Sequence, residues 1–193
     1  MEYRNELKFE LSDFDLIRIK NRLFPLMHPD SHQGSTGYLI RSIYFDDLYD
    51  SCAAEKENGV CCREKYRIRQ YDNDPNYIRL EKKTKYGDMS KKTMQELRPQ
   101  DYESLLSGNM ENLHLILSRN KGSLLEEFVL KMLYKQFSPK CIVEYERFAF
   151  IENTGNGEHH ETRFPGISLA AYRRGFTVFR RLLEGSRFGE HQF

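Results

Sequence analysis

The chain has no tryptophan, only four cysteines among its 193 residues, and no long apolar run. A membrane-spanning helix needs about 20 consecutive apolar residues. The N-terminal stretch MEYRNELKFEL also has no apolar segment of the kind found in secretion signals. The cysteines (Cys52, Cys61, Cys62 and Cys141) show neither a CxxC pair nor a Cys/His metal spacing. We therefore expect a soluble, cytoplasmic domain without a direct membrane span, and thiols rather than disulfides.

The chain also has no large excess of either charge, because 30 Lys and Arg residues nearly balance 29 Asp and Glu residues. A protein that coats nucleic acid needs a basic surplus, so no nucleic-acid partner is expected. Hydrophobic residues make up 39% of the chain and aromatic residues 13%, which excludes a disordered chain. This length and composition suit one globular domain with its own core.

The order of apolar and polar residues predicts an α+β fold with an antiparallel sheet. Alternation and turn signals predict strands over 2–11, 38–45, 62–71, 77–85, 90–97 and 140–151. Capping residues and apolar spacing predict helices over 12–26, 48–55, 100–106 and 123–137. Helices inserted between hairpins are typical of α+β architectures.

Basic residues recur at alternate positions of three predicted strands. The residues that share a charged face are Arg4, Glu6 and Lys8, then Lys65, Arg67 and Arg69, then Arg79, Glu81, Lys83 and Lys85. The ordinary interpretation is a sheet with one face in water. However, like charges on adjacent strands destabilise a sheet unless something neutralises them. The alternative is a barrel whose charged interior binds a polyanion.

Phosphate suits such a surface, because arginine binds phosphoryl oxygens with a planar fork and lysine supplies a mobile charge. The carboxylates of Glu6 and Glu81 are candidate oxygen ligands for a divalent ion that bridges phosphates. The chemistry expected here is phosphoryl transfer, in which positioning and charge stabilisation supply most of the catalysis.

Five strings in order carry a family resemblance. They are RNELKF (4–9), IRSIYFDD (40–47), EKENGVCCREKYRIRQY (55–71), LEKKTK (80–85) and VEYERFAF (143–150). Together they resemble the VTC-type polyphosphate polymerase domain, a branch of the CYTH-like triphosphate tunnel metalloenzymes. The resemblance implies an antiparallel β-barrel tunnel with flanking helices. It also implies transfer of the terminal phosphate of ATP to inorganic polyphosphate, with Mn²⁺ or Mg²⁺.

The resemblance also implies a set of site residues. It assigns catalysis to Arg67, Arg69 and Lys83. Phosphate binding is expected of Lys8, Arg41, Lys65, Lys91, Tyr145 and Arg147. For the lysine after the next turn, Lys91 and Lys92 are both candidates, and Lys91 is favoured because it follows Ser90 directly.

Composition changes near Gly157. From Glu158 to Phe193 there are six arginines but no Lys, Asp or Asn, and no L-E-x-K string of the family. We therefore divide the chain into a partial VTC-like domain (1–157) and an atypical tail (158–193), either a genuine second region or a stretch read in a shifted frame. The barrel is expected to be incomplete at its C-terminus. Two alternatives to the polymerase follow: a polyphosphate- or triphosphate-binding module without turnover, and a tunnel-type triphosphatase.

Overall fold

The structure, a computed structural model, describes residues 9–30, 34, 37–151, 166–172 and 177–178. Its strands are β1 (His28–Pro29), β2 (Tyr38–Asp46), β3 (Cys62–Tyr71), β4 (Ile78–Tyr86), β5 (Met89–Leu97), β6 (Ser138–Ile151), β7 (Gly166–Tyr172) and β8 (Thr177–Val178). Its helices are α1 (Asp13–Leu23), α2 (Ser51–Glu57), α3 (Pro99–Ser107), α4 (Met110–Arg119) and α5 (Leu124–Lys135).

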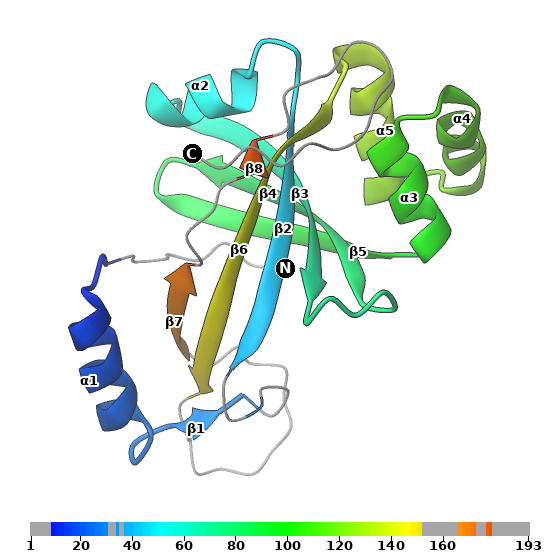
Figure 1. Ribbon diagram of the computed structural model, residues 1–193. Coiled ribbons are helices and arrows are strands. Elements are labelled where there is room, and N and C mark those ends of the chain that lie inside the picture. Colours follow the sequence, from blue (N-terminus) through cyan, green and yellow to red (C-terminus); the bar gives the residue numbers. More distant parts are fainter. Residues whose placement is uncertain (1–8, 31–33, 35–36, 152–165, 173–176, 179–193) are drawn as a thin grey trace.

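The strands form one antiparallel sheet in the order β1-β6-β2-β3-β4-β5, and β7 and β8 also pair with β6 (Figure 1). The sheet curls into a half-barrel with helices around it, so the predicted α+β class is confirmed. The predicted strand over 2–11 falls largely outside the described residues, and its last residues, 9–11, are not in a strand. None of the helices described is long and apolar enough to cross a membrane.

Local signals set the helix starts as predicted in two cases. The Ser12 side chain accepts a hydrogen bond from the Asp15 backbone N at 3.1 Å, and α1 follows. Ser123 caps α5 in the same way through the Glu126 N at 3.2 Å. Helix α4 was not predicted, although Asn109 caps it through the Asn112 N.

The core lies between the sheet and helices α3, α4 and α5. Phe128 of α5 stacks on Tyr66 of β3 with ring centroids 5.4 Å apart, and meets Phe45 of β2 edge-on at 4.9 Å. Ile68 and Leu80 lie opposite each other on β3 and β4 and are buried in the same cluster. Because side chains alternate along a strand, the residues between these apolar ones point to the other side of the sheet.

Two backbone features position the ends of the strands on the side of the sheet opposite the helices, where β2 begins. At Gly37 (φ +83°) an added Cβ would lie 2.5 Å from the Arg147 carbonyl oxygen, so only glycine permits β2 to start this close to β6. After β3 the chain makes a tight turn through Asp72 and Asn73, both with positive φ, and the Asp74 N donates to the Tyr71 O. Six residues (72–77) connect β3 to β4, and the Asp72 N donates to the Leu39 O of β2, which ties this turn to the β2 end of the face.

Candidate functional site: a cationic face of the sheet

The face of the sheet opposite α3–α5 collects basic side chains. By strand register, β3, β4 and β5 place eight cations on it against two glutamates, Glu81 and Glu96. The cations are Arg63, Lys65, Arg67 and Arg69 on β3, Arg79, Lys83 and Lys85 on β4, and Lys92 on β5. We call these eight residues the cationic face.

Three of its lysines lie in one row across the sheet. Lys65 is directly opposite Lys83, and Lys83 is directly opposite Lys92. Residues paired in this way have their Cβ atoms about 4.5–5.5 Å apart, and like charges at that spacing destabilise a sheet. A bound anion would relieve the repulsion.

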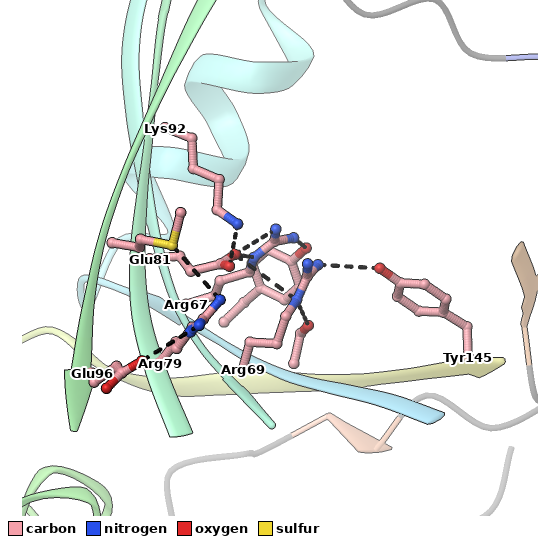
Figure 2. Close-up of polar contacts among 10 residues, drawn as sticks. Arg67, Arg69, Arg79, Glu81, Lys92, Glu96 and Tyr145 are labelled. Carbon is pink, nitrogen blue, oxygen red and sulfur yellow. Dashed lines mark hydrogen bonds and ion pairs between the residues drawn. The ribbon is translucent and has the colours of Figure 1, made fainter. Parts of the chain in front are cut away.

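Glu81 is the centre of the cationic face (Figure 2). Its side chain is 2% exposed, and its Oε2 accepts a hydrogen bond from the Arg67 Nε at 2.7 Å. Arg69 Nε lies 3.9 Å from the same oxygen, and Lys92 Nζ forms an ion pair with Oε1. Burial by itself would raise the pKa of the Glu81 carboxyl. The surrounding cations, Arg67 first, outweigh burial and lower this pKa to about 2.

The cations respond to the same environment. Burial lowers the pKa of Lys92, and Glu81 only partly opposes that shift. Burial would also lower the pKa of Arg67, but Tyr44 and Glu81 raise it overall, and the Tyr44 hydroxyl lies 2.8 Å from Arg67 Nη1. At neutral pH the centre therefore keeps one carboxylate among two guanidinium groups.

Strands β2 and β6 complete the surroundings of Arg69. Its Nε donates to the Ser42 Oγ at 3.2 Å, and its Nη2 donates to the Tyr145 hydroxyl at 3.1 Å (Figure 2). Burial raises the pKa of Tyr145, although Arg69 opposes the shift. The phenol therefore stays neutral and accepts the hydrogen bond that fixes the Arg69 fork. Arg69 itself is 5% exposed.

A family model decides the relationship of the chain to known proteins. The VTC domain model matches residues 3–159. The chain belongs to the VTC domain family. A search among curated proteins found no match. The family connects this VTC domain with polyphosphate, a polyanion of the kind that its cationic face suits.

The VTC domain brings most of the predicted site residues together. Arg67, Arg69, Lys65 and Lys83 belong to the cationic face. Tyr145 reaches it through Arg69. Arg147 lies opposite Tyr38 in the β2–β6 ladder, two residues along β6 from Tyr145 and on the same side of the sheet.

Two predicted phosphate ligands lie on the other side of the sheet. Arg41 is opposite Gln70 and Glu144 in the ladders, and its Nε forms an ion pair with the Glu144 carboxylate. Lys91 is opposite Thr84 and lines a cavity at the start of α5 together with Lys82. The lysine that contacts Glu81 is therefore Lys92, whereas the sequence favours Lys91.

The two remaining predicted residues, Lys8 and Glu6, lie outside the described residues. Of the predicted metal ligands this leaves Glu81, whose two oxygens already contact Arg67 and Lys92. Within the described ranges there is no group of three or more His, Cys, Asp or Glu side chains that could hold a metal ion.

Proposed function

We propose that this VTC domain is a polyphosphate polymerase that transfers the terminal phosphate of ATP to an inorganic polyphosphate chain held on the cationic face. The supporting observation is the excess of eight cations over two glutamates on one side of β3–β5. A polyphosphate chain carries a regular row of charges, so it neutralises a cationic surface built from several adjacent strands.

Phosphoryl transfer asks the protein mainly to position the reactants and to stabilise charge on the phosphoryl oxygens. Arg67 and Arg69 supply two planar forks, each held by neighbouring oxygen atoms. Lys83 lies next to them in the row of three lysines. Groups fixed before the substrate arrives need little reorganisation in the transition state, which is the main source of electrostatic catalysis.

Glu81 has a distinct role in this proposal. It keeps Arg67, Arg69 and Lys92 together when no phosphate is bound, because each contacts its carboxylate. An incoming phosphate oxygen competes for the same donors. A requirement for Mn²⁺ or Mg²⁺ is also part of the proposal and rests on the family resemblance. Glu6 and Glu81 are the candidate ligands, because a divalent ion that bridges phosphates needs oxygen ligands.

The test is to incubate the purified full chain with ATP, with and without Mn²⁺ or Mg²⁺, and to assay for polyphosphate and ADP. Arg67→Ala and Lys83→Ala should abolish both products while circular dichroism shows a folded protein. Arg41→Ala is the matched control: it removes an arginine from the opposite side of the sheet, where Arg41 pairs with Glu144, and should keep activity. Folded wild-type protein that forms neither product would overturn the polymerase.

One observation favours a second candidate, a binding module without turnover. The expected reaction uses a divalent ion, and the stretch from Glu158 to Phe193 contains no L-E-x-K string of the family. Calorimetry with polyphosphate separates the two functions, because a module binds the polymer without forming ADP. A tunnel-type triphosphatase would instead release phosphate from tripolyphosphate and build no polymer.

A further inference from the structure

Three tyrosines cluster at one end of the cationic face. Tyr38 starts β2, Tyr71 ends β3 and Tyr77 immediately precedes β4. The ring centroids of Tyr38 and Tyr71 are 5.9 Å apart, and those of Tyr71 and Tyr77 are 5.3 Å apart. The cluster runs from the buried Tyr38, 8% exposed, to Tyr77 at the rim, 37% exposed.

An arginine lies over each ring. Arg79 is the closest, with its guanidinium carbon 4.2 Å from the Tyr77 ring centroid. Arg69 lies 5.9 Å from the Tyr71 centroid, and Arg147 lies 5.8 Å from the Tyr38 centroid. Such contacts are cation–π interactions.

Arg79 is fixed by more than Tyr77. Its Nη2 lies 3.4 Å from the Glu96 Oε1, and its Nη1 lies 3.9 Å from the Met94 sulfur (Figure 2). A ring and a guanidinium group are thereby held against each other beside the phosphate-binding centre. Flat groups of this kind are what nucleic-acid-binding proteins use to stack bases.

The tyrosine cluster suits a different kind of ligand group from the one that suits the cations around Glu81. The face of an aromatic ring carries partial negative charge, so it repels a phosphate oxygen. A nucleobase, in contrast, stacks on tyrosine rings and on guanidinium planes. Tyr71 is four residues beyond Arg67 on the same strand, a separation of ~13 Å at about 3.3 Å per residue. This leaves room for a ribose and phosphates between a base at Tyr77 and the Arg67 centre.

We propose that Tyr77 and Arg79, supported by Tyr71, form the stacking site for the nucleobase of a nucleoside triphosphate whose phosphates lie on the cationic face. This inference rests on the proposed function and adds the subsite that distinguishes a nucleotide from an inorganic triphosphate. Stacking is tolerant of base identity, so ATP and GTP bind with similar affinity.

The experiment is calorimetry on the full chain with two probes, ATP and inorganic tripolyphosphate, in the same buffer. Tyr77→Ala is expected to weaken ATP binding about 5- to 150-fold, which corresponds to one stacked base, and to leave tripolyphosphate binding within about twofold. Tyr77→Leu should behave alike, because it keeps apolar packing without a ring, whereas Tyr77→Phe should retain wild-type affinity. Tyr86→Ala is the matched control, since Tyr86 ends β4, the strand that Tyr77 immediately precedes, and is 57% exposed.

Each other outcome is decisive. If Tyr77→Ala weakens ATP and tripolyphosphate equally, the ring only positions Arg79, and the stacking site is overturned while the proposed function stands. The same holds if neither affinity changes. If the wild-type protein binds neither probe, the stacking site and the proposed function fail together.

Discussion

Arg67 and Glu81 lie directly opposite each other on β3 and β4, and the Arg67 Nε donates a 2.7 Å hydrogen bond to the Glu81 carboxylate. The pair is largely removed from water, with side-chain exposures of 22% and 2%. One carboxylate thus holds cations from three residues in the absence of phosphate. In the proposed function, Glu81 is therefore both a stabilising group and a competitor of the bound phosphate.

Glu81→Gln is expected to tighten binding of tripolyphosphate about tenfold when no divalent ion is present. The substitution removes the only negative charge at Arg67, Arg69 and Lys92 among the residues described, so a phosphate no longer displaces a carboxylate. Calorimetry in a chelator measures the change. Glu96→Gln is the control, because Glu96 is 74% exposed and is screened by solvent. Weaker binding by Glu81→Gln would mean that Glu81 acts chiefly by positioning the arginines.

The stability of the domain should depend on pH through Glu81. The folded-state pKa of about 2 is below the usual 4.5, so this carboxylate stabilises the fold above about pH 4.5, and the contribution is lost as pH falls toward 2. The pKa difference corresponds to roughly 3 kcal/mol near neutral pH. Urea unfolding of wild type and Glu81→Gln from pH 7 to pH 3 checks this. Their free energies of unfolding should converge with falling pH, and a constant gap would contradict the assignment.

Alternation along single strands was enough to predict which residues of β3 share a side. Lys65, Arg67 and Arg69 are separated by apolar or helix-facing residues, and the structure places the three together. The start of α5 at Ser123 could also be predicted, because the Ser123 side chain caps the helix through a residue only three positions away. Both features depend on contacts within a few residues, so the sequence carries them directly.

Features that depend on the pairing between strands could not be predicted from the sequence. β2 has apolar residues on both sides of the sheet, so the sequence did not show that Arg41 faces Glu144 rather than the cationic face. The choice between Lys91 and Lys92 depends on the β4–β5 register, which pairs Lys83 with Lys92. The hairpin turn determines that register, and a one-residue slip reverses every side chain.

Lys92→Ala is expected to weaken tripolyphosphate binding about tenfold, because Lys92 contributes a half-buried charge beside Glu81 and opposite Lys83. Lys91→Ala is the matched control one residue away. Lys91 is on the helix-facing side with Thr84, so its removal should change the affinity less than about twofold. Calorimetry on both variants decides which lysine serves the site. A larger loss for Lys91→Ala would contradict the register between β4 and β5.

Tyr145→Phe tests whether the hydroxyl of Tyr145 positions Arg69. The substitution removes the acceptor of the 3.1 Å hydrogen bond from Arg69 Nη2 and keeps the ring. A hydrogen bond to a charged group contributes about 1.5–3 kcal/mol, so we expect ADP formation to slow by about tenfold or more. The loss should appear in kcat rather than in KM for ATP, because the proposed phosphate ligands Lys92 and Arg67 are unchanged in this variant. Tyr134→Phe on α5, where the ring is 80% exposed, is the control and should be silent. Unchanged turnover in Tyr145→Phe would show that Ser42 alone is sufficient to orient the Arg69 fork.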